Sequence, residues 1–383
     1  MTEQKNKKRK VLRNNEYYGQ QEILDDLYKK SSEGRYFDKL YELVIDENNI
    51  MKAYRTIKRN TGSKTKGING HTIKYLERLS KSKLVSIVRQ RLSYYTPNPV
   101  RRVFIPKSNG KQRPLGIPTI EDRLIQQCIL QILEPICEGK FHKSSYGFRP
   151  NRSTHHAIAR CQHLINHSNN HFVVDVDIKG FFDNVKHGKL VKQLWTIGIR
   201  DKRLVCIISR MLKAEIVGEG TSTKGVPQGG ILSPLLANIV LNEFDWWISN
   251  QWETKATNHI YTQPSSKIKA LKSSKLKPCY IVRYADDFKI FTDSRTNAKK
   301  LFTATKLWLD DRLGLEISEE KSKITNLRKN GSDFLGIRLR AVSKGTSQLG
   351  YVSQSKIEPK RKSKNNRGIQ KQAKRFKQKS EYG

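Results

Sequence analysis

The chain has 383 residues, 36% of them hydrophobic, and its 74 lysines and arginines against 35 acidic residues give a formal net charge of +39. The length allows about two or three packed units, and no apolar run approaches a membrane span, so we expect no membrane partner. The charge exceeds what solubility needs and indicates a polyanion; nucleic acid is favoured over an anionic membrane surface, for which we find no strongly amphipathic basic helix.

The five cysteines, at positions 128, 137, 161, 206 and 279, are scattered and form no Cys-x-x-Cys pair. A disulfide framework or zinc knuckle is therefore not expected, and a reducing compartment is, which we take to be the bacterial cytoplasm or nucleoid. Residues 1–13 are basic without a following apolar stretch, so they do not predict a secretory signal. Residues 1–35 are interpreted as a flexible or loosely helical basic arm that is either solvated or in contact with phosphates.

Residues 36–61 carry apolar side chains at helical spacing and predict one or two amphipathic helices. Residues 97–118 then predict two strands around a turn at Asn109-Gly110, with Lys107 and Arg113 on either side of it. Two cations on a short hairpin suit a triphosphate, although ordinary surface charge is the alternative.

Thr119 begins a predicted scaffold helix that runs to about Ile136, and Asp122 three residues later gives a variant of the capping box. The loop over residues 144–153 interleaves arginines with aromatic residues. That mixture suits a nucleic-acid strand, because rings pack on sugars or bases while guanidinium groups hold phosphates. Another helix is predicted from Thr154 to about Ile165.

Residues 172–178 alternate between apolar and other side chains, which predicts a strand with Asp175 and Asp177 on one face. A strand that buries its apolar face can hold a metal ligand rigidly. We favour Asp177 as that ligand and interpret Asp175 as a partner behind it or as facing solvent. Asp183 is interpreted as a structural acid that caps the following helix.

A turn rich in glycine and proline over residues 225–234 leads into a helix, and its amides can approach a substrate closely. Residues 251–279 are polar, rich in lysine and without clear periodicity; we interpret them as an exposed insertion and hypothesise that they bind RNA, as does the N-terminal arm. A helix is predicted over 294–313, and strands over 315–318 and 334–339. Lys321 between these strands is either a phosphate contact or a plain surface lysine.

Asp286 and Asp287 are adjacent acids between two runs of β-branched and aromatic residues, a pattern that predicts a tight hairpin with both acids at its tip. Neighbouring carboxylates repel each other unless a cation neutralises them, and oxygen ligands favour Mg²⁺ or Mn²⁺ over zinc. A solvated Asp-Asp turn is the alternative for the pair taken alone. Together with Asp177, the pair supplies the carboxylates of a two-metal site for in-line nucleotidyl transfer.

Tyr-Ala-Asp-Asp at 284–287 resembles the signature of reverse transcriptases, and its context is similar to that of group II intron-encoded reverse transcriptases, or maturases. The supporting blocks occur in family order between about residues 50 and 340, at 67–70, 102–118, 145–153, 174–185, 225–234, 283–288, 315–321 and 334–336. The resemblance implies an α/β (α+β) right-hand polymerase, with fingers, and a palm whose antiparallel sheet has flanking helices.

The resemblance also implies roles for single residues. Asp177, Asp286 and Asp287 are the implied catalytic carboxylates, which with the Ile178 carbonyl would hold two Mg²⁺ ions, for which Mn²⁺ can substitute. Lys107 and Arg113 match residues that grip the incoming triphosphate, Phe182 the ring that excludes a 2′-hydroxyl, and Gln228 a glutamine that lines the nucleotide site. Phe181 is placed at the same site, mainly as packing. Arg149, Arg152, Gly229 and Lys321 are assigned to template and primer.

The expected organisation is a basic arm over 1–35, fingers with an N-terminal extension over 36–170, a palm over 171–345, and the start of a thumb or a disordered basic tail over 346–383. The palm includes the insertion over 251–279, and an intervening part of the fingers within 171–345 is left open. Family members carry a helical thumb after the palm. Residues 351–356 resemble its entry, and we expect a complete thumb to be lacking. No cysteine-paired His-Asn-His nuclease pattern is present.

The favoured function is an RNA-directed DNA polymerase of a group II intron. Its expected partners are dNTPs, an RNA template, a DNA primer, the intron RNA whose splicing and retrohoming it assists, and target DNA. One alternative is a maturase with an idle polymerase site that acts only as a splicing factor. Another is a related reverse transcriptase of a retron, a diversity-generating element or a CRISPR system. The oligomeric state stays open.

Overall fold

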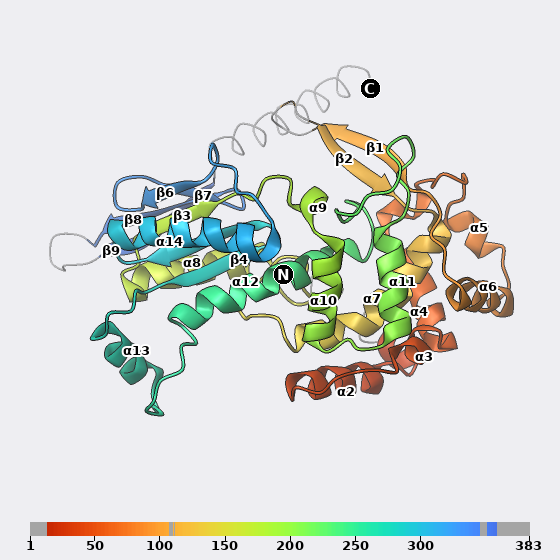
Figure 1. The fold of residues 1–383 in the computed structure, drawn as a ribbon, viewed down its shortest axis with the longest axis horizontal. Coiled ribbons are helices and arrows are strands. Elements are labelled where there is room, and N and C mark those ends of the chain that lie inside the picture. Colours follow the sequence, from red (N-terminus) through yellow and green to blue (C-terminus); the bar gives the residue numbers. More distant parts are fainter. Residues whose placement is uncertain (1–13, 107–109, 111, 345–350, 358–383) are drawn as a thin grey trace, which may run out of the picture. The chain divides into compact units, whose positions relative to one another are not determined.

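The computed structural model describes residues 14–106, 110, 112–344 and 351–357, and the chain divides into two compact units. Unit 1 comprises residues 1–142, 179–244 and 309–316, and unit 2 comprises residues 143–178, 245–308 and 317–383. Figure 1 labels the helices and strands. The expected α/β class with antiparallel sheets is confirmed. Among the helices of the described residues, none combines the length and the apolar character that a bilayer crossing requires.

Unit 1 is mostly helical, and α7 (Ile120–Glu138) lies at its centre, packed against α2, α3, α4 and α6. The other elements of unit 1 are α2 (Gln21–Ser32), α3 (Leu40–Val44), α4 (Glu47–Lys58), η1 (Thr61–Lys64), α5 (Ile73–Glu77), α6 (Lys81–Ser93), β1 (Arg101–Pro106), β2 (Gln112–Ile117), α9 (Phe181–Asn184), α10 (His187–Ile197), α11 (Lys202–Leu212), the first part of α12 (Ser233–Gln251) and the π-helical turn η2 (Leu309–Leu313). The predicted cap of α7 is confirmed, because the Thr119 side chain accepts a hydrogen bond from the Asp122 amide.

The carboxylate of Asp122 also joins three other parts of unit 1, although its residue is only 1% exposed. It accepts hydrogen bonds from Arg91 (2.9 Å), from the Tyr95 hydroxyl (2.9 Å) and from the backbone nitrogen of Asn98 (3.1 Å). A buried carboxylate is stable only when donors surround it in this way. Asp122 therefore ties α6 and the start of the hairpin to α7.

Of two predictions about the N-terminal third, the structure corrects one and confirms the other. Residues 21–32, expected within a basic arm, instead form α2, whose Leu27 is buried and whose Ser31 hydroxyl donates to the Ile136 carbonyl of α7 (2.6 Å). This stretch is therefore helical but not a free arm, because α7 covers its apolar face. The predicted hairpin is confirmed: β1 and β2 pair antiparallel, with Ile105 opposite Arg113. Lys107 lies outside the described residues.

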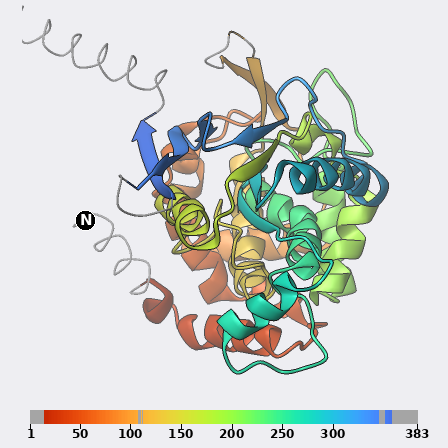
Figure 2. The same ribbon diagram turned by 90° about the vertical axis from the view of Figure 1, so that its left-hand side faces the viewer.

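The main sheet of unit 2 has the strand order β4-β5-β3-β6, and each neighbouring pair is antiparallel. These strands are β3 (Phe172–Val176), β4 (Tyr280–Tyr284), β5 (Asp287–Thr292) and β6 (Lys323–Asn326). Helix α14 (Arg295–Trp308) packs against β3, β5 and β6, and α8 (Thr154–Ser168) packs against β4. Figure 2 shows these two helices on opposite faces of the sheet. The predicted helix from Thr154 is thereby confirmed.

A second sheet in unit 2 joins β7 (Ser332–Phe334), β8 (Ile337–Ser343) and β9 (Tyr351–Ile357). The strand predicted over 334–339 is divided between β7 and β8, because Leu335 and Gly336 adopt φ of +54° and +81° and form the turn between them. The strand predicted over 315–318 is reduced to an isolated bridge between Ile317 and Ile178. The segment that resembles the entry of a thumb forms β9.

The insertion predicted over 251–279 contains one helix, α13 (Pro264–Lys272), which projects away from the main sheet of unit 2 (Figure 1). The segment is anchored at its base by the Trp252 indole, which donates to the Tyr280 hydroxyl (2.8 Å), and by buried Leu271. Ile260 between these anchors is 89% exposed. The predicted exposure is therefore confirmed, and the helix was missed because few of its residues are apolar.

Candidate active site

The hairpin of β4 and β5 carries the adjacent acids as predicted. Tyr284 pairs with Asp287, so Ala285 and Asp286 form a two-residue turn. Ala285 has a φ of +60°, which is the geometry of the first turn position in a type II′ hairpin, where glycine is usual. Asp286 is therefore at the tip, and Asp287 begins β5.

The register of β3 and β5 brings the third carboxylate to the same edge. Asp175 lies opposite Lys289, and Val176 lies opposite Phe288. Side chains alternate between the two faces of a sheet. Asp177, two positions after Asp175, and Asp287, two positions before Lys289, therefore share the face of the Asp175–Lys289 pair. Asp177 directly follows β3, so continuing this register would bring it to Asp287, and its role as a metal ligand stays a prediction.

Loss of hydration and, to a smaller extent, neighbouring acids weaken the acid strength of Asp287. Although the residue is exposed as a whole, loss of hydration around its carboxyl raises its pKa to about 6, and Asp175, Asp286 and Asp177 add to the rise while Lys289 opposes it. The three predicted ligands therefore create a negative potential that a cation would relieve.

The donor set fits a hard divalent cation, although the side chains of the described residues do not close into a group of three or more carboxylate, imidazole or thiolate ligands around one point. The Ser318 amide donates to the Asp177 carbonyl (2.7 Å) beside the Ile178–Ile317 bridge. The Lys321 ammonium group pairs with Asp177 (3.0 Å) and occupies one of its oxygens. A metal ion that binds this same oxygen would have to displace Lys321. The assignment of Lys321 to template and primer stays a prediction.

Asp175 does not face solvent, so that part of its interpretation is wrong. It is 9% exposed and forms an ion pair with Lys289, which is 2% exposed. The Ser332 hydroxyl donates to both of its oxygens (3.1 and 2.9 Å), and Thr325 donates to one (3.3 Å). Asp175 faces inward because β7 and β6 supply these donors. The expected cap at Asp183 is also wrong: Asp183 lies inside α9, and the N-cap of α10 is Lys186.

The predicted nucleotide-binding residues of unit 1 are linked through backbone hydrogen bonds. The Val226 amide donates to the Phe182 carbonyl (2.7 Å), and the Gly116 amide of β2 donates to the Gln228 carbonyl (2.7 Å). The strand that carries exposed Arg113, the turn that carries Gln228, and Phe182 therefore belong to one backbone framework. Their contact with a nucleotide stays a prediction.

Phe181 and Phe182 differ in burial. Phe181 is 2% exposed and Phe182 is half-buried, and their rings meet edge to face with centroids 5.3 Å apart. Packing is therefore the role that the burial of Phe181 supports. Gly229 has a φ of +116°, and a Cβ atom there would lie 2.7 Å from the Gly116 carbonyl oxygen. Glycine at 229 therefore allows the close approach to β2, and its contact with the template stays a prediction.

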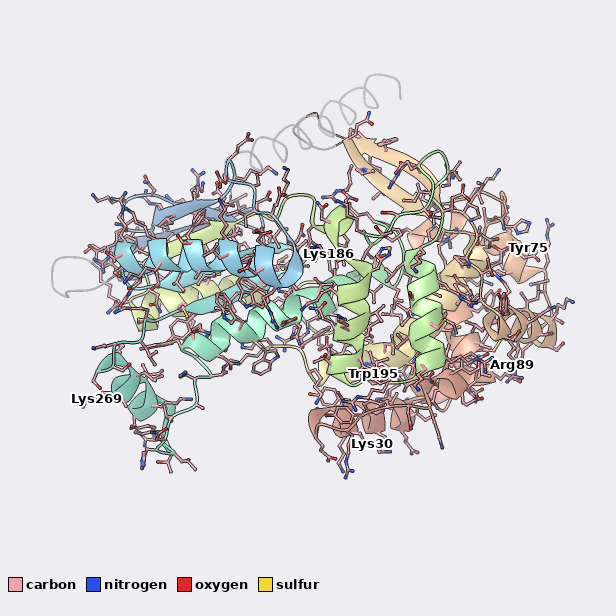
Figure 3. The ribbon with its side chains drawn as sticks, in the orientation of Figure 1. Lys30, Tyr75, Arg89, Lys186, Trp195 and Lys269 are labelled. Carbon is pink, nitrogen blue, oxygen red and sulfur yellow. The ribbon has the colours of Figure 1, made fainter. Side chains whose placement is uncertain are left out.

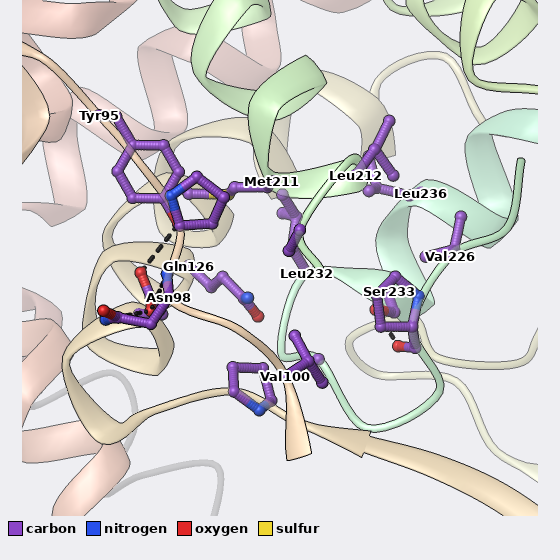
Figure 4. A pocket seen from close by; sticks show the side chains of 16 residues that line it. Tyr95, Asn98, Val100, Gln126, Met211, Leu212, Val226, Leu232, Ser233 and Leu236 are labelled. Carbon is purple, nitrogen blue, oxygen red and sulfur yellow. Dashed lines mark hydrogen bonds between the residues drawn. The ribbon is translucent and has the colours of Figure 1, made fainter. Parts of the chain in front are cut away.

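Side-chain contacts hold the turn over 225–234 in place, next to a small cavity of about 30 Å³ (Figure 4). The Gln126 side chain accepts a hydrogen bond from the Ile231 amide (2.7 Å), and the Ser233 hydroxyl donates to the Pro227 carbonyl (2.7 Å). The His187 ring, only 4% exposed, lies 2.7 Å from the Gly225 carbonyl oxygen. The turn therefore has little freedom to move Gln228. Sequence reasoning missed His187, since nothing in the local pattern marks it.

The arginines predicted to hold template and primer are engaged with their own loop. Arg149 is 7% exposed and donates to the Ser145 carbonyl (2.9 Å), and Arg152 donates to the Lys143 carbonyl (2.5 Å). The Arg152 guanidinium also lies 5.5 Å from the centroid of the Tyr146 ring. Both arginines therefore stiffen the loop that precedes α8, and direct contact with nucleic acid stays a prediction.

Comparison with known proteins identifies the class. The family model for reverse transcriptase (RNA-dependent DNA polymerase) matches residues 105–339, so the chain belongs to the reverse transcriptase family. Protein YkfC of Escherichia coli K12 is 34% identical over 317 residues, covering 79% of this chain and 82% of YkfC. The group II intron-encoded protein LtrA of Lactococcus lactis is 34% identical over 370 residues, covering 85% of this chain.

The relatives also indicate which type of reverse transcriptase the chain is. The putative COX1/OXI3 intron 2 protein of Saccharomyces cerevisiae is 31% identical over 338 residues, covering 78% of this chain. The chain is thus a reverse transcriptase of the group II intron type, an RNA-directed DNA polymerase. It spans 60% of LtrA and 38% of the yeast protein. Reverse transcriptases bind RNA templates and generally use divalent metal ions.

Proposed function

We propose that Asp177, Asp286 and Asp287 hold two Mg²⁺ ions, with the Ile178 carbonyl as a further ligand, and that the chain extends a DNA primer on an RNA template. The shared sheet face of Asp177 and Asp287, next to the Asp286 turn, carries this proposal. When bound, the metal ions activate the primer 3′-hydroxyl and stabilise the leaving pyrophosphate. The protein contributes by fixing its carboxylates on a rigid sheet edge. Mn²⁺ is proposed as a substitute.

The incoming nucleotide is proposed to meet the framework of unit 1. Arg113 would hold the triphosphate, together with Lys107, which lies outside the described residues. Phe182 would block a 2′-hydroxyl, and Gln228 would line the sugar and base. The hydrogen bonds from Val226 to Phe182 and from Gly116 to Gln228 support a common site, because they fix the two side chains to one backbone.

The first test is primer extension on an RNA template with dNTPs and Mg²⁺, comparing the wild type with Asp286→Asn. We expect the wild type alone to extend. An inactive wild type that still binds intron RNA tightly would favour a maturase with an idle polymerase site. Extension by both proteins would overturn the metal-site assignment.

The RNA partner is proposed from the similarity to LtrA. We infer that the chain binds a group II intron RNA, assists its splicing, and copies it during retrohoming at a DNA target. A cytoplasmic location follows from that role. Intron RNA should therefore bind more tightly than an unrelated RNA of equal length at the same salt concentration, and equal affinity would contradict this specificity.

A second RNA-binding surface is proposed on the insertion that contains α13. Residues 254–278 contain six lysines and no acidic residue. Five of the lysines are exposed, including Lys269, which Figure 3 labels at the far side of α13. The insertion joins β4 at Tyr280, the end of the strand opposite to the Asp286 turn. RNA held here would therefore lie away from the polymerase site.

Replacing Lys269, Lys272, Lys275 and Lys277 with glutamine tests this surface. We expect weaker binding of structured intron RNA and a salt slope lower by up to about one per lysine, with unchanged extension of a short template–primer. The matched control replaces four exposed lysines of unit 1, at positions 29, 83, 192 and 202. Equal losses in both variants would indicate general charge attraction and contradict a dedicated surface.

A further inference from the structure

The turn that carries Asp286 is held in a conformation that its own residue does not favour. Ala285 is 8% exposed and has a φ of +60°, in the left-handed region that glycine adopts freely and alanine does not. Such a backbone persists only when the surrounding structure fixes it, and strained residues of this kind cluster at active sites. The contacts that fix the Ala285 backbone are therefore candidates for a functional role.

One neighbour is a fully buried ion pair. Arg283 and Asp245 are each 0% exposed, and the Arg283 guanidinium donates to both Asp245 oxygens at 2.6 to 3.0 Å. The remaining terminal nitrogen of Arg283 donates to the Ala285 carbonyl (2.7 Å). Asp245 lies on α12, so the helix reaches the turn through one rigid side chain. Because the guanidinium is planar, fixing it at Asp245 also fixes the direction in which it holds Ala285.

The other neighbour is a backbone that runs along β4. The Arg283 amide donates to the Ser144 carbonyl (2.9 Å), and the Tyr146 amide donates to the Arg283 carbonyl (2.8 Å). Gly147 follows directly. A Cβ atom at Gly147 would overlap the Ala285 nitrogen and lie 2.9 Å from the Tyr284 carbonyl carbon. Only glycine therefore lets this backbone lie against the turn.

We propose that Gly147, Asp245 and Arg283 form a turn clamp, a set of positioning residues that hold Ala285 in the left-handed conformation and so aim Asp286 and Asp287. The inference rests on the proposed function, because it takes these two acids as catalytic. It adds residues that touch no substrate atom and that act only through the turn. Arg149 supports the clamp from outside, since it holds the Ser145 carbonyl of the same backbone (2.9 Å).

The first test is Gly147→Ala, with Gly188→Ala as its control, because a Cβ atom at Gly188 meets nothing within 4 Å. We expect Gly147→Ala to slow primer extension by about 10²-fold, since small displacements of catalytic groups have effects of this size. Mn²⁺ binding, followed by electron paramagnetic resonance, should weaken, and template–primer affinity should not change. The control should match the wild type. Wild-type extension by Gly147→Ala would overturn the clamp.

The second test separates positioning from stability. The double variant Asp245→Leu/Arg283→Met replaces the buried pair with apolar side chains, an exchange that proteins often tolerate without loss of stability. We expect a folded protein that has lost extension, because the Ala285 carbonyl has lost its donor. Adding Ala285→Gly should restore part of the activity, since glycine adopts the left-handed conformation unaided. A folded double variant with full extension would overturn the clamp, as would the absence of any rescue.

Failure of the proposed function has a different signature. If the wild type does not extend primers, the proposed function fails. The turn clamp is then tested separately, by measuring amide hydrogen exchange of residues 280–290. Faster exchange there in Gly147→Ala than in Gly188→Ala supports the clamp, and equal exchange overturns it. If the double variant does not fold, the Gly147→Ala comparison decides alone.

Discussion

Lys289 lies directly across from Asp175 in the register of β3 and β5, and its ammonium group is the ion-pair partner of that carboxylate. The pair is buried one step behind Asp177 and Asp287 on the same face of the sheet. The acidic edge is therefore backed by a cation that belongs to the protein. Lys289 also lies 5.2 Å from the centroid of the Phe334 ring, which the second sheet contributes.

The ion pair between Asp175 and Lys289 should affect the free energy of unfolding, and a double variant separates the cost of an unpaired charge from the loss of the pair. Lys289→Met should lower the free energy of unfolding by about 3–5 kcal/mol, because it leaves a buried carboxylate without its cation. Asp175→Leu/Lys289→Met should recover most of that loss, since neither charge then remains. Urea denaturation of the three proteins measures both effects. A double variant less stable than Lys289→Met would contradict this account.

The raised pKa of Asp287 predicts a pH dependence of stability in the absence of metal. Its carboxyl titrates at about 6 in the folded chain, whereas an unfolded chain releases this proton at about pH 4. Between these values the folded state binds the extra proton, so the free energy of unfolding falls as the pH rises from about 4 to about 6. The melting temperature of Asp287→Asn, measured with a chelator present, should fall less over this range. Identical pH profiles would speak against the raised pKa.

Phe182 and Phe181 should respond differently to truncation. Phe182→Ala should increase the incorporation of ribonucleotides relative to deoxyribonucleotides and leave stability nearly unchanged, because the side chain is only half-buried. Phe181→Ala should instead lower the free energy of unfolding by about 3–5 kcal/mol, as for other buried aromatic residues. Single-nucleotide extension and urea denaturation measure the two effects. Unchanged nucleotide selection in Phe182→Ala would remove that residue from the proposed site.

Asp122 should be among the most sensitive positions of unit 1. Asp122→Ala leaves Arg91 unpaired and strips the buried Tyr95 hydroxyl of its acceptor, so we expect a loss of about 3–5 kcal/mol in the free energy of unfolding. Asp26→Ala is the control, because its ion pair with Lys30 is half exposed and contributes at most about 0.5 kcal/mol. Similar losses in both variants would contradict a special role for burial.

Local sequence patterns predicted the elements that local physics determines. The cap at Thr119, the alternation around Asp177 and the hairpin around Asp286 were all readable from neighbouring residues. The turn at Leu335 was not, because leucine rarely adopts a positive φ and the pattern around it is that of a strand.

The parts of the site that sequence reasoning missed are long-range pairs. Arg283 interrupts an apolar strand and Asp245 follows an apolar stretch of helix, and each looks like an isolated charge until folding joins them across 38 residues. Lys289 and Asp175 are 114 residues apart. Gly147 gave no signal beyond being glycine, since its role depends on which backbone lies beside it.

The division of the chain into interleaved segments has a consequence for its synthesis. Unit 1 is complete only with residues 309–316, where Arg312 pairs with Glu243 (2.9 Å). At typical translation rates, the ribosome adds these residues roughly ten to thirty seconds after residue 142. During that interval the first helices have an unfinished partner surface. Their exposure to chaperones and proteases is therefore set by the speed of translation, and any contiguous fragment of the gene that encodes one unit whole also encodes part of the other.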